Sequence, residues 1–201
     1  MATGASEPMR RTRASAGLVV AALTLTAGVT GCGGGHASHR RVAGPFAWLR
    51  PTPPPTGWEV ARIPGGSTLA YPPGWRAIKT DPGTASLALL GGGGRFDAYL
   101  NATPKQGPET LANWSRFRPD HNRGEGNRSV RVVASASDLS FRSGRGSCVI
   151  DSYTTSKDVY REIACLVAGP SASAVVVAAA PTSVWDDQAA TLERAVSSFV
   201  P

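Results

Sequence analysis

The chain has 201 residues, of which 41% are hydrophobic and 17% are charged, and its formal net charge is +7. Such a length suits one domain with an additional tether. The lysine and arginine residues form no dense run, which argues against the clustered cationic footprint of a nucleic-acid partner and favours a solvated surface beside anionic lipid or wall polymer.

Residues 1–31 have the organisation of an export signal. Three arginines between positions 10 and 13 precede an uncharged, largely apolar stretch over residues 14–31, and small residues close that stretch. The tetrad Val-Thr-Gly-Cys that ends at Cys32 resembles a bacterial lipobox, and this resemblance implies a diacylglycerol on Cys32. Acyl chains at this position would hold the protein on the outer face of the bacterial cytoplasmic membrane.

Two alternatives to lipidation remain open. The segment is either an ordinary cleaved signal that leaves Cys32 as a free thiol, or an uncleaved membrane span. Its apolar run lies at the short edge of the roughly 17 to 25 residues that a span requires, and it is rich in Gly, Ala and Thr. Arg10 and Arg11 lack the apolar residues that usually follow a twin-arginine pair, so the export route stays open between the general and twin-arginine systems.

Residues 32–56 have the composition of a flexible, lipid-anchored linker. Glycines follow the anchor, and the proline-rich run at 51–55 favours extended polyproline II geometry. His36 and His39 lack the third and fourth ligands of a closed metal site, so no metal is expected. Phe46 and Trp48 are unusual in a disordered tether. They either dock on the following domain or partition into the lipid interface.

The predicted domain, residues 57–201, begins with short apolar-containing runs separated by turn residues, a pattern typical of β-strands. Residues 67–71 and 75–79 form a strand pair or a strand-turn-strand around Pro-Pro-Gly. Residues 86–90 and 96–102 form a hairpin around four glycines. Because neither Gly-Lys-Ser/Thr nor a helix follows these glycines, they do not form a phosphate-binding loop.

A helix is predicted over Pro108–Phe117, with Glu109 in its first turn and Trp114 on its apolar stripe. Pro119 is expected to end the helix. The polar residues that follow, His121 among them, have the composition of a surface loop. Extended patterns resume at 130–136 and at 139–142, with a turn predicted at 137–138.

The next two runs are rich in β-branched and aromatic residues and flank a polar centre, which predicts a hairpin. If the hairpin folds about Ser156-Lys157, Cys148 lies directly opposite Cys165. Directly opposed residues in a non-hydrogen-bonded antiparallel pair have Cα atoms about 4.5 Å apart, near the lower limit for a disulfide. A structural bridge suits an exported chain. A reactive thiol pair is disfavoured because the spacing is not Cys-x-x-Cys.

Residues 172–180 form a nearly continuous apolar run, which predicts a strand buried on both faces. A helix follows, with Ser183 as the expected N-cap and two acidic residues in its first turn. Trp185, Leu192 and Phe199 recur at helical spacing on one face of this helix. Such a stripe indicates packing against a sheet.

Two short motifs carry a resemblance to a known fold: Tyr-Pro-Pro-Gly-Trp at 71–75 and Ala-Val-Ser-Ser-Phe at 195–199. Together with the mid-chain helix and the meander of strands, residues 57–200 resemble the PsbP-like fold, including small actinobacterial envelope lipoproteins. The resemblance implies an α+β class in which an antiparallel sheet packs against helices. Its members are mainly non-catalytic accessory or adaptor proteins without a shared catalytic set, so neither an active-site residue nor a cofactor is expected.

No catalytic constellation emerges from the residues. His121 is the only histidine of the predicted domain and has Asp120 beside it, but Ser147 lacks the Gly-x-Ser-x-Gly elbow of a nucleophilic serine. Five carboxylates show no spacing that would mark a glycosidase pair: Asp97, Glu109, Asp138, Asp151 and Glu162. We therefore expect the protein not to be an enzyme.

These observations predict a membrane-anchored accessory or interaction module of the cell envelope, which binds a protein partner at an exposed aromatic or apolar patch. The alternative is an extracytoplasmic carrier of a lipid or another small apolar ligand. A carrier requires a concave pocket between sheet and helix, lined by residues such as Trp75 or Trp114. The two hypotheses therefore differ in the surface that the fold must present.

Overall fold

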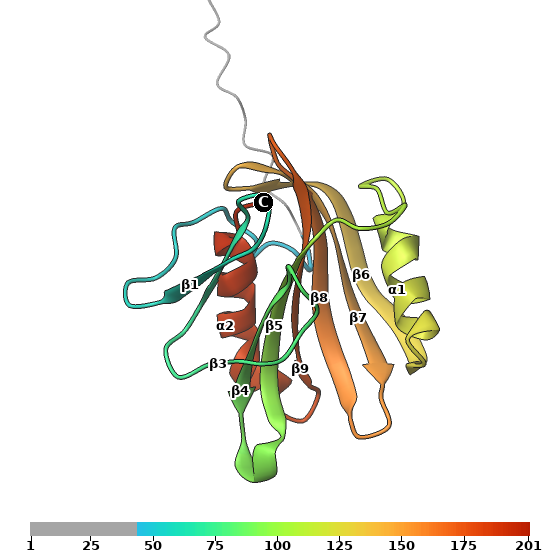
Figure 1. Ribbon diagram of the computed structural model, residues 1–201. Coiled ribbons are helices and arrows are strands. Elements are labelled where there is room, and N and C mark those ends of the chain that lie inside the picture. Colours follow the sequence, from blue (N-terminus) through green and yellow to red (C-terminus); the bar gives the residue numbers. More distant parts are fainter. Residues whose placement is uncertain (1–43) are drawn as a thin grey trace, which may run out of the picture. The chain divides into compact units, whose positions relative to one another are not determined.

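A seven-stranded antiparallel sheet with a helix on each face organises residues 44–201, the part of the chain that this computed structural model describes (Figure 1). The elements in chain order are β1 (Glu59–Arg62), β2 (Thr68–Tyr71), β3 (Arg76–Ala77), β4 (Ala85–Leu90), β5 (Phe96–Pro104), α1 (Trp114–Gly124), β6 (Arg128–Phe141), β7 (Gly144–Thr154), β8 (Val159–Ala168), β9 (Ser173–Pro181) and α2 (Trp185–Ser198). The strand order is β3-β4-β5-β9-β8-β7-β6, and β1 pairs with β2 in a separate sheet. The predicted α+β class is confirmed.

The alternation of side chains along the central strands places the two helices on opposite faces of the sheet. Ile163 and Val176 belong to the core cluster that contains Leu192 and Phe199 of α2. A second cluster packs with Trp114 of α1, and its strand residues are Val149, Ala164, Leu166, Val175 and Val177. Because successive residues such as Val175 and Val176 belong to different clusters, α1 and α2 cover different faces.

The predicted buried strand and C-terminal helix are both present. Every residue of β9 after Ser173 is buried, because the strand lies between β5 and β8 and its side chains enter the apolar clusters on both faces of the sheet. The apolar stripe of α2 faces the core, as predicted. The N-cap prediction was wrong, because Val184 occupies the N-cap position and offers no side-chain cap. Ser183 lies one residue earlier, in a turn closed by a hydrogen bond from the Val184 N–H to the Pro181 carbonyl.

The hairpin of β7 and β8 has the predicted register. Cys148 lies opposite Cys165, their Cα atoms are 4.1 Å apart, and the two sulfurs form a disulfide. Both cysteines are buried beneath α2, at most 1% exposed. The bridge therefore connects two central strands inside the core.

Replacing Cys148 and Cys165 together with alanine is expected to lower the free energy of unfolding by about 3 kcal/mol, because the bridge restricts a loop of 17 residues in the unfolded chain. Urea denaturation of both proteins measures the difference. Adding a thiol reductant to the native chain provides the control, since it should reproduce the variant's stability. Equal urea midpoints for the oxidised chain and the variant would contradict the prediction.

Residues upstream of the predicted domain boundary pack onto the core. Phe46 and Leu49 are 2% and 6% exposed, and Trp48 packs against the same cluster. Of the two alternatives for the aromatic residues, docking on the domain is the one observed. The packed part of the chain therefore extends upstream of residue 57.

The predicted export signal, the lipidation site Cys32 and the two linker histidines lie outside the described residues. Within residues 44–201, neither helix has the length and apolar character that a membrane span requires. The membrane anchor therefore remains a prediction from the sequence.

Three local strand predictions had different outcomes. The β4–β5 hairpin around the glycines is confirmed. The Pro-Pro-Gly segment joins a strand, a turn and a strand, but β2 pairs with β1 and β3 pairs with β4. Two prolines without an N–H group and Gly74, at φ +87°, lead the chain from one sheet to the other. The turn predicted at 137–138 is instead a bulge within β6, where Asp138 has a φ of +58°.

Candidate functional site

Helix α1 begins and ends later than the sequence predicted. Residues 108–113 form its approach, in which the Thr110 N–H donates to Asn113 Oδ1 over 2.7 Å and the Asn113 N–H donates to Thr110 Oγ1 over 3.1 Å. The helix then continues through Pro119 to Gly124. Proline normally disfavours a helix interior, but here Trp114 and Asn122, on either side of it, are both buried against the sheet. Tertiary packing therefore overrides the local stop signal.

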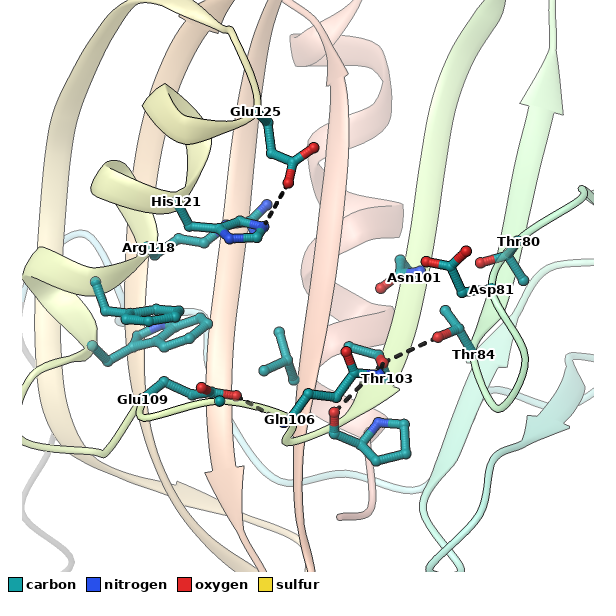
Figure 2. A pocket seen from close by; sticks show the side chains of 15 residues that line it. Thr80, Asp81, Thr84, Asn101, Thr103, Gln106, Glu109, Arg118, His121 and Glu125 are labelled. Carbon is teal, nitrogen blue, oxygen red and sulfur yellow. Dashed lines mark hydrogen bonds and ion pairs between the residues drawn. The ribbon is translucent and has the colours of Figure 1, made fainter.

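Because the helix is longer than predicted, His121 lies near the C-terminal end of α1 instead of in a loop. Helix α1 forms one wall of a pocket. Helix α1 packs on β6 and β7, so the half of this sheet face that belongs to β4 and β5 lies beside the helix without being covered by it (Figures 1 and 2). The resulting α1 pocket has a volume of about 550 Å³. Its lining residues are Thr80, Asp81, Thr84, Asn101, Thr103, Pro104, Gln106, Gly107, Glu109, Trp114, Phe117, Arg118, His121, Glu125 and Val175.

Polar side chains on or next to β4 and β5 are connected by hydrogen bonds along one side of the α1 pocket. Thr84 Oγ1 donates to Thr103 Oγ1 over 3.0 Å, and Asn101 Nδ2 donates to Ser86 Oγ over 2.8 Å. Gln106 Nε2 reaches the same Thr103 hydroxyl at 3.4 Å. Figure 2 shows Thr84, Asn101 and Thr103 across the pocket from the α1 wall. The pocket therefore presents hydroxyl and amide groups in fixed positions.

Trp114 is a predicted ligand-binding residue that does reach the pocket. It is only 2% exposed, and its indole N–H donates to the Ala164 carbonyl over 2.9 Å. Its ring stacks on Phe117 at 5.9 Å between centroids, and Phe117 stacks on His121 at 6.1 Å. Trp114 thus anchors the helix to the sheet and supports the exposed end of this aromatic stack.

Trp75, the second predicted ligand-binding residue, does not line the α1 pocket. It is 8% exposed and packs in the cluster beneath α2, on the other face of the sheet. Its position follows from the turn after β2, which carries the chain toward that core. Its indole packs in this core, and a role of Trp75 in ligand binding stays a prediction from the sequence.

Two buried carboxylates lie at the contact between α1 and the sheet. Asp151 on β7 is directly opposite Glu162 on β8, and each is 1% exposed. Arg118 of α1 donates to Glu162 through both Nε and Nη2, at 2.6 and 2.8 Å, and Asn122 Nδ2 donates to Asp151 Oδ2 at 3.1 Å. The Tyr153 hydroxyl also donates to Glu162, at 3.2 Å. Helix α1 is therefore held to the sheet by a buried polar network.

The environment of this network shifts the proton affinity of its members. Burial, followed by the negative charge of Glu162, raises the pKa of Asp151 to about 7. Burial alone would lower the pKa of the Arg118 guanidinium, but the adjacent Glu162 carboxylate raises it above its ordinary value. Asp151 Oδ1 has no hydrogen-bond partner among residues 44–201. The Glu162 carboxylate is thus compensated, whereas Asp151 is compensated only in part.

Sequence reasoning missed this network, although one signal for it was present. The hairpin register that places Cys148 opposite Cys165 also places Asp151 opposite Glu162 three residues along. Opposed like charges are unfavourable unless a cation joins them. The register of the hairpin does not identify that cation, because Arg118 belongs to a helix and lies 44 positions from Glu162 in the sequence.

The residues considered for catalysis have other partners. Asp120 accepts a hydrogen bond from Arg123 at 2.6 Å, and His121 Nε2 lies 3.8 Å from Glu125 Oε1 (Figure 2). Ser147 is 2% exposed, and its hydroxyl donates to the Leu111 carbonyl at 2.6 Å. The hydroxyl of Ser147 and the imidazole of His121 therefore do not form a nucleophile and base pair in the described chain.

No protein-family model matches the chain, and no curated protein matches its sequence. Among solved structures, the cyanobacterial PsbP protein (CyanoP) of Synechocystis aligns with a TM-score of 0.55 and 15% identity, over 72% of this chain and 92% of its own. A Pseudomonas aeruginosa protein of unknown function aligns with a TM-score of 0.48 and 12% identity, over 72% and 96%. LpqN of Mycobacterium tuberculosis, described as involved in cell envelope biogenesis, aligns with a TM-score of 0.37 and 14% identity, over 72% and 91%. The CyanoP match shows that this chain has a PsbP-like fold.

Proposed function

We propose that the protein is a non-catalytic accessory module of the bacterial cell envelope, tethered through a lipid on Cys32, which binds its target in the α1 pocket. The observation that carries the proposal is the asymmetry of the sheet. Helix α2 covers one face with an apolar core, whereas α1 leaves a polar pocket beside it on the other face. Small-molecule sites are concave and use a few precisely placed polar groups to orient the ligand.

The chemistry of the pocket argues against the apolar-carrier alternative. Its lining is dominated by hydroxyl, amide and charged side chains, and its largest aromatic residue, Trp114, is almost fully buried. A lipid chain placed there would remove these polar groups from water without offering them hydrogen bonds, which is unfavourable. The target of this pocket is therefore a polar one.

An apolar docking patch has less support in residues 44–201. The large apolar side chains that are exposed there are Val60, Leu90, Val132, Val133 and Val159, and no aromatic residue is among them. Val132 and Val133 are neighbours on β6, at the edge of the sheet. Two adjacent valines form a much smaller surface than an apolar recognition patch of several hundred Å².

Anchoring is tested by growing the bacterium with labelled palmitate and isolating the full chain. We expect label in the wild-type protein and none in the Cys32→Ser variant, because serine offers no thiol for acylation. Membrane fractionation of the same cells should move the variant out of the membrane fraction. Label that enters both proteins equally would contradict the anchor.

Target binding is tested with a photo-crosslinking amino acid introduced into the full chain in living cells. Position 80, at the open side of the α1 pocket, is expected to give a specific adduct, since Thr80 is exposed and lines the pocket. Position 187, exposed on α2 on the other face, is the matched control. Adducts of equal yield from both positions would count against the pocket as the binding surface.

A further inference from the structure

A second pocket lies at the end of the sheet where the β4–β5 and β7–β8 turns are found. Residues of both turns line it, and Figure 1 shows the two turns at the same end of the sheet. The pocket has a volume of about 730 Å³ and shares no lining residue with the α1 pocket. We call it the tyrosine pocket, because Tyr99, Tyr153 and Tyr160 line it together with Phe96. It is therefore a separate candidate for ligand binding.

The register of the sheet places the three tyrosines on one face. Tyr99 on β5 lies opposite Ala179 on β9, and Ala179 lies opposite Glu162 on β8. Tyr160 is two residues from Glu162 and therefore shares its face. Tyr153 on β7 lies opposite Tyr160, and the two rings stack at 5.9 Å between centroids. Aromatic side chains from three strands thus gather at this end of the sheet.

The aromatic side chains of the tyrosine pocket are not all enclosed by the protein. Tyr153 is 8% exposed and donates its hydroxyl to Glu162 at 3.2 Å, so it is fixed in place. Phe96, Tyr99 and Tyr160 are half-buried and line the pocket. Half-buried rings in a concave site offer a ligand an apolar surface of defined shape.

Two phenol groups of the pocket are available as hydrogen-bond donors. Within residues 44–201, the tyrosine hydroxyls that bond to protein acceptors are those of Tyr71 and Tyr153. Burial raises the pKa of both Tyr99 and Tyr160, so their hydroxyls stay protonated at neutral pH. A ligand with acceptor oxygens can receive hydrogen bonds from these two groups.

The charged side chains of the pocket add two cations against one carboxylate. Lys157 is exposed and forms no ion pair with another described residue. Arg95 contacts Asp97 at 3.4 Å on the surface, a weak pair that leaves most of the guanidinium donors free. The carboxylate is that of Asp158, whose Oδ1 accepts a hydrogen bond from the Val159 N–H at 2.9 Å. The pocket therefore favours an anion with several acceptor oxygens.

The remaining polar groups fit a ligand that also carries hydroxyls. Asn127 and Ser156 line the pocket, and an amide or a hydroxyl side chain can both donate and accept. A sugar ring combines apolar C–H faces, which pack on aromatic rings, with hydroxyls at its edges. A phosphate supplies the anionic acceptors that arginine and lysine bind through charge-assisted hydrogen bonds.

We propose that the tyrosine pocket binds a phosphorylated sugar, with the phosphate received by Arg95 and Lys157 and the ring packed against the aromatic side chains. This inference goes beyond the proposed function, because it assigns a ligand to a second pocket. The same chemistry occurs in free sugar phosphates and in lipid headgroups that join a polyhydroxylated ring to a phosphate. The volume of about 730 Å³ lies within the range of small-molecule sites.

Isothermal titration of the full chain in detergent tests the proposal, with glucose 1-phosphate as the probe. Glucose and inorganic phosphate each carry half of the recognised chemistry and should bind at least about tenfold more weakly. Glucose that binds as tightly as the probe would overturn the phosphate assignment. Inorganic phosphate that binds as tightly would mean an adventitious ion only and would overturn the sugar assignment.

A second titration separates the two sources of the ligand. Glycerophosphoinositol is the soluble headgroup of a membrane lipid. Binding at least as tight as that of glucose 1-phosphate would support the proposal with a lipid headgroup as the ligand, and weaker binding would support it with a free sugar phosphate. Absence of binding to both compounds would overturn the proposal.

Variants assign the binding to particular residues. Arg95→Gln and Lys157→Gln, both at exposed positions, should each weaken the binding of glucose 1-phosphate about three- to tenfold. Tyr160→Leu removes one ring and should weaken it about tenfold. Arg142→Gln removes an exposed cation at the β6–β7 turn, at the opposite end of β7, and should leave the affinity unchanged.

The exposed variants keep the test decisive if the tyrosine variant does not fold. Circular dichroism establishes folding, and Arg95→Gln and Lys157→Gln then decide the question alone. Affinities equal to that of Arg142→Gln for every folded pocket variant would overturn the site. Because the tyrosine pocket and the α1 pocket share no lining residue, failure of this proposal leaves the cross-linking result at position 80 unaffected.

Discussion

An Arg118→Ala variant is expected to unfold with a free energy about 3–5 kcal/mol below that of the native chain. The substitution removes both hydrogen bonds to Glu162 and leaves a carboxylate that is 1% exposed without its cation. An uncompensated buried charge costs far more than the ion pair itself contributes. Because Arg118 also connects α1 to β8, the amides of the helix should lose hydrogen-exchange protection in addition to the decrease in the global free energy of unfolding. Urea denaturation measures the first effect, and exchange of the α1 amides measures the second.

Two further variants distinguish burial of charge from loss of an ordinary ion pair. Arg123→Ala removes another ion pair of α1, the exposed contact with Asp120, and should cost less than about 1 kcal/mol. The double variant Arg118→Leu with Glu162→Leu replaces the buried pair by apolar side chains and should recover most of the loss. If Arg118→Ala were no more destabilising than Arg123→Ala, the buried network would not anchor the helix.

Stability is expected to fall as the pH rises from about 4 to about 7. The pKa of Asp151 is raised to about 7 in the folded chain, chiefly by burial and then by Glu162, against an ordinary value of 3.8. Below about pH 4 the carboxyl is protonated in both states. Between the two values the folded state keeps a proton that the unfolded chain has released, so each rise in pH favours unfolding. One pKa unit corresponds to about 1.4 kcal/mol, which sets an upper limit of about 4 kcal/mol for the whole window.

The Asp151→Asn variant tests the source of this pH dependence. Its amide oxygen can still accept the hydrogen bond from Asn122, and no ionisation remains at the site. The variant should lose the decline between about pH 4 and 7 and be more stable than the native chain above that window. Asp120→Asn neutralises an exposed carboxylate of α1 and should retain the native slope. Thermal or urea unfolding at several pH values measures both, and an unchanged slope in Asp151→Asn would refute the assignment.

The fold could be predicted wherever one strand or helix carries its own pattern. The apolar run of β9 and the stripe of α2 were identified from their periods, because burial on two faces or on one helical face leaves a direct imprint on residue order. The Cys148–Cys165 bridge followed from the register of one hairpin, which depends on the position of its turn alone. These features are local, and their residues lie close together in the chain.

The errors arose where a distant contact outweighed the local signal. Pro119 would end an isolated helix, yet α1 continues past it because Trp114 and Asn122 are buried against strands far along the chain. Trp75 and Trp114 looked alike as ligand candidates, but one turn directs Trp75 into the core beneath α2 while Trp114 reaches the α1 pocket. The position of Phe46 was likewise not predictable, because the Gly- and Pro-rich residues around it gave no indication that its side chain is buried.

Residue order alone was thus sufficient to predict the central strand, the C-terminal helix and the disulfide, since each depends on periodicity or on a single hairpin. The α+β class followed from the resemblance to the PsbP-like fold. The candidate site was not accessible in this way. Glu109, Arg118 and Thr103 belong to a loop, a helix and a strand that meet only after the sheet has formed, and Arg118 finds its carboxylate partner 44 residues away. Burial and charge compensation are properties of that packed arrangement, so the α1 pocket forms only when the sheet and both helices are in place.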